Sequence, residues 1–124
     1  MRQAGRLLKL TAFGHALIGV VLFRAPLADI VGAGVLNTVA WQLDRQAAFW
    51  FLLFSPICYA LGQIVDRAIE RRDSRLLAIV GWHLLGVGVA GAALMPVSGF
   101  WLIIAIAPFV LHASRQVGPI AASA

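Results

Sequence analysis

The chain has 124 residues, of which 61% are hydrophobic and 12% are charged, and its formal net charge at pH 7 is +5. Soluble domains usually carry about 25% charged residues, so this composition excludes an ordinary soluble domain. A positive charge can indicate a nucleic-acid partner, but the basic residues here do not gather on one soluble face. We therefore expect a single membrane domain that binds no nucleic acid.

Four apolar stretches, at about 7–23, 47–65, 76–95 and 97–111, together contain one lysine and no acidic residue. A helix needs about 20 apolar residues to cross a hydrocarbon core of about 30 Å, and the fourth stretch is the shortest of the four. Because lipid offers the backbone no hydrogen bonds, uninterrupted apolar runs indicate helices. The sequence predicts an all-α fold, a four-helix transmembrane bundle in which residues 1–124 form one domain.

The basic residues are divided unequally between the two predicted sides of the membrane. Arg24 and Arg45 lie on one side, and eight lie on the other: Arg2, Arg6, Lys9, Arg67, Arg71, Arg72, Arg75 and Arg115. The positive-inside rule places the larger group in the cytoplasm. We therefore expect a multi-pass protein of the cell inner (plasma) membrane, in contact with the lipid bilayer, with both termini cytoplasmic. The first stretch resembles a secretory signal, but its removal would leave an odd number of spans, so we expect it to be retained.

The exterior segment at 26–45 is unusually apolar for a loop. At about 3.6 residues per turn, Asp29, Asn37 and Asp44 would share one helix face, with Trp41 close to it. We expect a short helix in the outer interface, broken at one of its glycines.

Three of the four predicted spans contain residues that affect helix shape or packing. Pro56 in the second stretch and Pro108 in the fourth are expected to bend their helices. Between the second and third stretches, residues 66–75 are expected to form a cytoplasmic hairpin whose arginines face lipid head groups. Residues 86–91 spell a dinucleotide fingerprint, but no strand precedes them, so the third stretch's glycines indicate close helix packing.

Short blocks along the chain carry a resemblance to a known family. They are residues 14–15 (Gly-His), 26–27 (Pro-Leu), 48–51 (Ala-Phe-Trp-Phe), 81–82 (Gly-Trp) and 95–102 (Met-Pro-Val-Ser-Gly-Phe-Trp-Leu). Together they resemble a bacterial family of small four-span membrane proteins that is catalogued as a domain of unknown function. The resemblance implies the architecture and no activity.

Two histidines fall within the predicted spans, where ionisable groups are functional candidates. His15 lies about 9 Å beyond Lys9 along the first helix, and His83 lies about 12 Å beyond Arg75 along the third. The two imidazoles could meet to relay a proton, to bind a polar ligand or to hold a haem iron. The alternative is that each histidine donates a hydrogen bond to a neighbouring carbonyl. No zinc-site spacing is present, and we expect no metal and no cofactor.

Most exterior polar residues lie close together in the sequence, between Arg24 and Arg45. Ion pairs could hold this segment in place, with Asp44 paired to Arg24 rather than to its neighbour Arg45. Alternatively, an aspartate acts as general acid or base on a lipophilic molecule. The candidate catalytic residues are therefore His15, Asp29 and Asp44. The candidate substrate-binding residues are Arg24, Asn37, Arg45, His83, Trp41 and Trp50.

The sequence is compatible with three functions. The preferred one is a bundle that binds, and isomerises or cyclises, a lipophilic small molecule in an intramembrane pocket. The second is a structural or transport homo-oligomer in which the glycine face of the third span packs two copies together. The third is a haem-binding bundle, which two histidines alone indicate only weakly.

Overall fold

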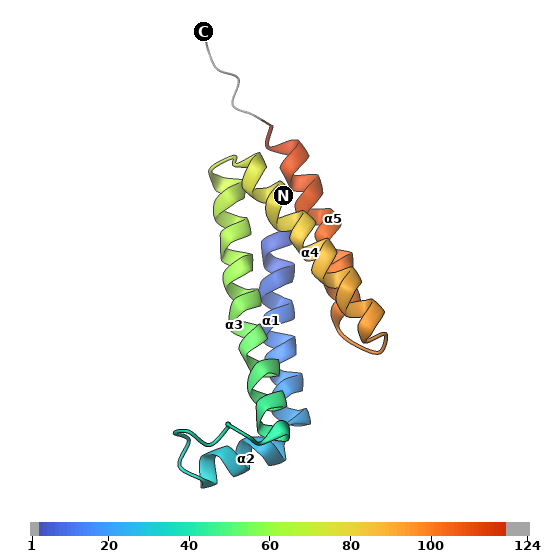
Figure 1. Ribbon diagram of the computed structural model, residues 1–124. Helices are drawn as coiled ribbons and strands as arrows, with labels where there is room; N and C mark the ends of the chain where they lie inside the picture. The colour runs from blue at the N-terminus through green and yellow to red at the C-terminus, as the bar shows by residue number, and fades with distance from the viewer. Residues whose placement is uncertain (1–2, 119–124) are drawn as a thin grey trace. The chain divides into compact units, whose positions relative to one another are not determined.

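The computed structural model describes residues 3–118, which contain five α-helices and no strand. They are α1 (Gln3–Leu22), α2 (Arg24–Gly32), α3 (Leu43–Glu70), α4 (Ser74–Leu94) and α5 (Phe100–Gln116), as Figure 1 shows. The described chain divides into two compact units, one of residues 3–9 and 60–118 and one of residues 10–59. Both α1 and α3 contribute to each unit. The predicted all-α class is confirmed for the described residues.

Three helices, α1, α3 and α4, are long and apolar enough to cross a membrane, as expected of a membrane protein. Their bounds contain most of the first three predicted stretches, and α3 extends further, to Glu70. α5 has 17 residues, which span about 25 Å at ~1.5 Å per residue, somewhat less than a hydrocarbon core of ~30 Å. Both α3 and α5 continue through their prolines, Pro56 and Pro108.

The surface of α1 indicates which solvent surrounds it. Leu10, Phe13, Leu17 and Val21 are each about two-thirds exposed. A continuous apolar surface of this kind is rare on soluble monomers and marks contact with a membrane or a partner. In lipid the same side chains are in their preferred environment.

In the unit of residues 3–9 and 60–118, α4 and α5 form an antiparallel hairpin held by close glycine contacts (Figure 1). Gly81 faces Leu111, Gly88 faces Ile104 and Gly91 faces Phe100, so the partner numbers fall as the glycine numbers rise. A Cβ atom at Gly88 would lie 2.8 Å from Cγ1 of Ile104. Small residues therefore allow α5 to approach the backbone of α4.

The expectation that the α4 glycines pack two copies together is not supported. Gly81, Gly88 and Gly91 contact α5 of the same chain, and only Gly86 has open space beside it among the α4 glycines. A second copy cannot occupy a face that α5 already covers.

In the unit of residues 10–59, α2 lies across the ends of α1 and α3 (Figure 1). α2 begins at Arg24 rather than after Pro26, because proline is tolerated in the first turn of a helix, where its missing N–H would have no partner. The expected common helix face of Asp29, Asn37 and Asp44 is wrong. α2 ends at Gly32, and the loop that follows has positive φ angles, including 57° at Asn37 and 68° at Trp41.

The predicted hairpin at 66–75 is present but shorter, because α3 includes Asp66 to Glu70. Asp73 caps α4: its side chain accepts a hydrogen bond of 2.8 Å from the backbone N–H of Leu76. Such caps typically stabilise a helix by about 1 kcal/mol. Arg72, with φ of 53°, completes the turn between α3 and α4.

We predict that Gly88→Leu lowers the free energy of unfolding by about 1–3 kcal/mol, because the larger side chain would overlap Ile104. Gly86→Leu is the matched control on the same helix, and it should change stability by less than about 0.5 kcal/mol. Unfolding of the purified variants in detergent measures both values. Equal losses for the two variants would contradict the observed packing of α4 on α5.

Candidate functional site

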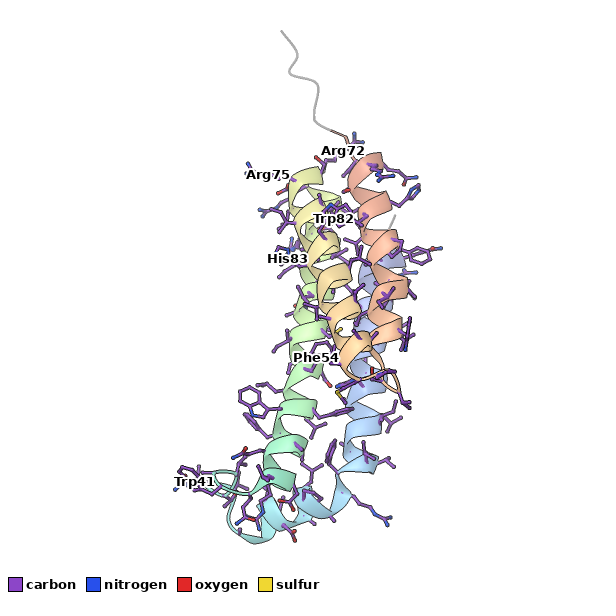
Figure 2. The ribbon with its side chains drawn as sticks, turned by 45° about the vertical axis from the view of Figure 1, so that its right-hand side comes forward. Trp41, Phe54, Arg72, Arg75, Trp82 and His83 are labelled. Atoms are coloured by element: carbon purple, nitrogen blue, oxygen red, sulfur yellow. The ribbon has the colours of Figure 1, made fainter. Side chains whose placement is uncertain are left out.

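Eight of the nine predicted site residues belong to the unit of residues 10–59, and His83 belongs to the other unit. Within the first of these, Trp41 is 94% exposed and Trp50 is 65% exposed. Figure 2 shows Trp41 on the loop that follows α2, pointing outward. Arg24, Asp29 and Asn37 are also exposed. The structure therefore does not gather the predicted exterior residues around an enclosed pocket.

His15 and His83, which the sequence placed in predicted spans, are both hydrogen-bonded to backbone carbonyls, as the simpler alternative predicted. Nε2 of His15 lies 3.0 Å from the carbonyl oxygen of Phe51, and Nδ1 of His83 lies 2.8 Å from that of Ile79. The His15 ring also stacks on Phe51 with centroids 3.9 Å apart, and meets the Phe54 ring edge-on at 5.2 Å. Since a carbonyl only accepts, each of these ring nitrogens carries a proton and donates it.

The charged residues that the sequence predicted to be exterior make local contacts rather than the predicted ion pair. Arg45 donates from Nη1 to the carbonyl oxygen of Thr38 at 2.9 Å, and Asp44 accepts from the backbone N–H of Arg45. Between residues 3 and 118, the ion pairs are Lys9–Asp66 and Arg67–Glu70. The expected pairing of Asp44 with Arg24 is therefore wrong: Asp44 lies in the first turn of α3 and accepts from a backbone N–H of its own helix.

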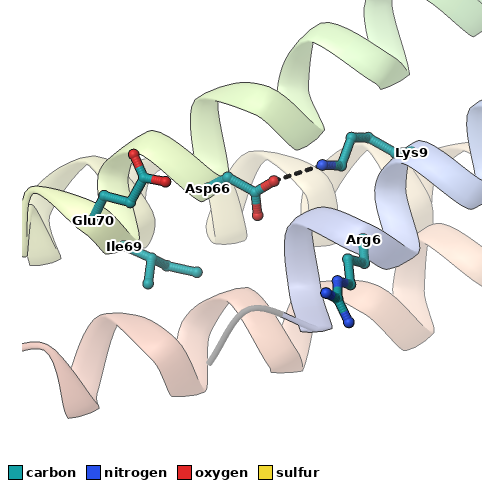
Figure 3. A pocket seen from close by; sticks show the side chains of 5 residues that line it. All are labelled: Arg6, Lys9, Asp66, Ile69 and Glu70. Atoms are coloured by element: carbon teal, nitrogen blue, oxygen red, sulfur yellow. Dashed lines mark hydrogen bonds and ion pairs between the residues drawn. The ribbon is translucent and has the colours of Figure 1, made fainter.

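The most polar arrangement inside the protein is the pair of Lys9 and Asp66, which the sequence analysis did not select. Nζ of Lys9 lies 2.7 Å from Oδ2 of Asp66, and each side chain is 28% exposed (Figure 3). The other carboxylate oxygen of Asp66, Oδ1, is buried and has no hydrogen-bond partner. Burying such an acceptor without a partner typically costs about 1–3 kcal/mol. The position of Asp66 therefore favours a ligand or a water molecule that donates a hydrogen bond.

Two glycines bring this pair together. Gly5 precedes Lys9 by four residues on α1, and Gly62 precedes Asp66 by four residues on α3. A Cβ atom on Gly5 would overlap the Asp66 carboxylate and lie 2.8 Å from the carbonyl oxygen of Gly62, and one on Gly62 would lie 2.7 Å from Cγ of Lys9. The equal four-residue spacing, Gly-x-x-x-Lys and Gly-x-x-x-Asp, is the sequence signal that could have identified the site.

The ion pair opens onto a cavity of about 210 Å³ lined by Arg6, Lys9, Asp66, Ile69 and Glu70. Figure 3 shows Arg6 on the same helix as Lys9, and Ile69 and Glu70 following Asp66 along α3. The cavity thus holds two cationic and two anionic groups, of which Lys9 and Asp66 already neutralise each other. Arg6 supplies further N–H donors and Asp66 supplies a free acceptor. In the described part of the chain no group of three or more His, Cys, Asp and Glu residues could hold a metal ion.

Comparisons with known proteins give a family and little about activity. The sequence model of a family of unknown function, DUF6463, matches residues 1–117. Myo-inositol transporter 2 of Cryptococcus neoformans is 33% identical over 89 residues, which cover 68% of this chain and 15% of the transporter. The chain thus matches only a small part of that relative's length. No solved structure matches the chain.

We predict that Lys9→Met and Asp66→Leu each lower the free energy of unfolding by about 1–3 kcal/mol, because each leaves a half-buried charge without its partner. The double variant should lose less than the sum of the two, with a coupling energy of about 1–2 kcal/mol. Unfolding in detergent measures all three values.

Arg67→Gln and Glu70→Gln form the matched control cycle. That pair is 3.9 Å apart and its side chains are 75% and 53% exposed, so its coupling should stay below about 0.5 kcal/mol. A Lys9–Asp66 coupling no larger than this value would show that the pair contributes little to the fold.

Proposed function

The chain belongs to DUF6463, a family of unknown function. We propose that it is a four-span plasma-membrane protein and that it binds a lipophilic small molecule at the Lys9–Asp66 cavity. One observation carries this proposal: the buried Oδ1 atom of Asp66 has no partner beside a cavity that also offers the Arg6 guanidinium. A head group with an O–H or N–H donor and an acceptor, such as a hydroxyl, satisfies both residues.

The size and position of the cavity define how such a ligand would sit. About 210 Å³ is below the ~300–1,000 Å³ of most small-molecule pockets, so the cavity takes a polar head and leaves an apolar remainder in lipid. Asp66 lies four residues before the end of α3, or about 6 Å along the helix axis. This depth suits an amphiphile that enters from the bilayer with its head at the interface.

The proposed topology has four spans, with both termini in the cytoplasm. In this proposal α5 is the short fourth span, and the excess of arginine and lysine on the side of the α3–α4 turn supports a cytoplasmic location of that side. The Lys9–Asp66 cavity then faces the cytoplasmic interface, and α2 with its loop lies outside.

Acid–base catalysis by His15, Asp29 and Asp44 stays a prediction. All three residues lie in the other unit, so replacing them leaves the Lys9–Asp66 cavity unchanged and tests the two candidate sites separately. A second candidate function, transport of a small polar molecule, is favoured by the similarity to part of a myo-inositol transporter. Movement of the bound molecule across a proteoliposome membrane, rather than retention alone, would separate transport from binding.

We predict that Asp66→Ala and Arg6→Gln each reduce the amount of a co-purifying lipophilic molecule at least tenfold, because each removes a charged hydrogen-bond partner worth about 1.5–3 kcal/mol. Native mass spectrometry of protein purified in mild detergent identifies the molecule and measures its occupancy. His15→Ala, Asp29→Asn and Asp44→Asn should keep wild-type occupancy. The reverse pattern would move the site to the originally predicted residues.

We predict that impermeant maleimide labels Asn37→Cys and Val97→Cys in intact cells, and labels Gln116→Cys and Glu70→Cys only after permeabilisation. All four positions are exposed, and Cys58 is the single cysteine, so Cys58→Ser supplies the unreactive background. Labelling of Val97→Cys and Gln116→Cys from the same side would show that α5 does not cross the membrane. Exterior labelling of Glu70→Cys would reverse the proposed orientation.

A further inference from the structure

The Lys9–Asp66 cavity has two walls of opposite charge. Both of its cationic residues, Arg6 and Lys9, lie on α1, and both of its carboxylates, Asp66 and Glu70, lie on α3 (Figure 3). Residues three or four positions apart share a helix face, so each pair can line the same cavity. Two positive and two negative groups give no net charge. Because they are separated by helix, the cavity is dipolar.

The Lys9–Asp66 ion pair leaves one further group free on each wall. On α3, Oδ1 of Asp66 is buried without a hydrogen-bond partner. On α1, Arg6 belongs to neither of the two ion pairs within residues 3–118. Glu70 lies 3.9 Å from Arg67, in an exposed pair that is weak. The α1 wall therefore offers a guanidinium, and the α3 wall offers a carboxylate oxygen with a second carboxylate near it.

The charge of a ligand decides how well it fits between these walls. An anionic head group gains from Arg6 but is repelled by the two carboxylates, and a cationic head group is repelled by the α1 wall. A hydroxyl donates to Asp66 but matches neither wall in charge. A head group that carries both charges matches both walls and keeps the total charge at zero.

On the basis of the function proposed above, we infer that the ligand of this cavity is a zwitterionic amphiphile whose head group joins a primary ammonium to a phosphate. The ammonium donates to Oδ1 of Asp66 and lies beside Glu70. The phosphate pairs with Arg6, whose planar guanidinium matches phosphate oxygens in geometry and charge. The ammonium has to be primary, because a quaternary ammonium carries the same charge but has no N–H to donate.

The test compares three lysophospholipids that carry the same acyl chain. Lysophosphatidylethanolamine has an ammonium with N–H donors, lysophosphatidylcholine has a quaternary ammonium, and lysophosphatidylglycerol has hydroxyl donors and no positive charge. Titration of the wild-type protein in mild detergent, followed by native mass spectrometry, should give about tenfold tighter binding of the first than of either other lipid, because only its hydrogen bond to Asp66 is charge-assisted. Phosphoethanolamine without an acyl chain should not displace it at the same concentration.

Two variants that remove equal charge at the same end of the protein test the α3 wall. Glu70→Gln removes a carboxylate of the cavity, whereas Asp73→Asn removes one that does not line it. Asparagine caps a helix as well as aspartate does, so Asp73→Asn should preserve the start of α4. Glu70→Gln should reduce the preference for the ethanolamine over the glycerol head group about threefold, and Asp73→Asn should keep it. Equal effects of the two variants would contradict the dipolar site.

The remaining outcomes separate this inference from the proposed function. Equal binding of the ethanolamine and glycerol lipids, with both lost in Asp66→Ala, would overturn the zwitterionic head group and leave the proposed function intact. The same holds if none of the three binds while another co-purifying molecule is lost in Asp66→Ala. If the wild-type protein retains no lipophilic molecule, both fail. Displacement by free phosphoethanolamine would support the head-group chemistry and overturn the lipophilic part of the ligand.

Discussion

The close approach of α1 and α3 at Gly5 and Gly62 is the constraint on which the polar end of this protein depends. Without a side chain at either position, the two backbones come near enough for Lys9 and Asp66, each one turn further along its helix, to form a 2.7 Å ion pair. A methyl group at either glycine would separate the helices or displace the pair. The glycine contact between α1 and α3 thus also sets the positions of Lys9 and Asp66, which line the cavity.

Apolar and charged side chains occupy different parts of the helices. The long helices α1, α3 and α4 expose large apolar side chains, while the charged groups lie toward the ends of the helices, in the turn between α3 and α4 and in the segment from Arg24 to Arg45. At the α3–α4 end, Asp66, Glu70 and Asp73 each serve a cationic or backbone partner. Residues 66–75 contain four arginines and three acidic residues, so the net charge of this segment is positive although acidic residues are present. The same acidic residues fix a helix pair, through Lys9–Asp66, and a helix cap, through Asp73.

The histidines show why an ionisable residue within a span is not by itself a site. In hydrocarbon, each imidazole needs a partner for its N–H, and a carbonyl oxygen of a nearby helix turn is available at Phe51 for His15 and at Ile79 for His83. Both side chains are explained by this local requirement. Asp66 differs, because Oδ2 is paired with Lys9 whereas Oδ1 is buried and has no partner. A buried polar atom without a hydrogen-bond partner indicates a ligand more strongly than the mere presence of an ionisable residue in an apolar helix does.

The sequence by itself determined the helical class and the extent of the apolar stretches, because hydrophobicity along a continuous helix depends only on local order in the chain. It also indicated a short helix after the first apolar stretch, which is α2 in the structure. It did not determine which residues would meet. The end of α2 at Gly32 separates Asn37 from Asp29, α5 covers three of the four α4 glycines, and Lys9 pairs with Asp66, which is 57 positions away in the sequence. Such contacts depend on how two helices cross. Only the tertiary structure shows that α1 and α3 cross at Gly5 and Gly62, where the absence of a side chain lets the backbones approach.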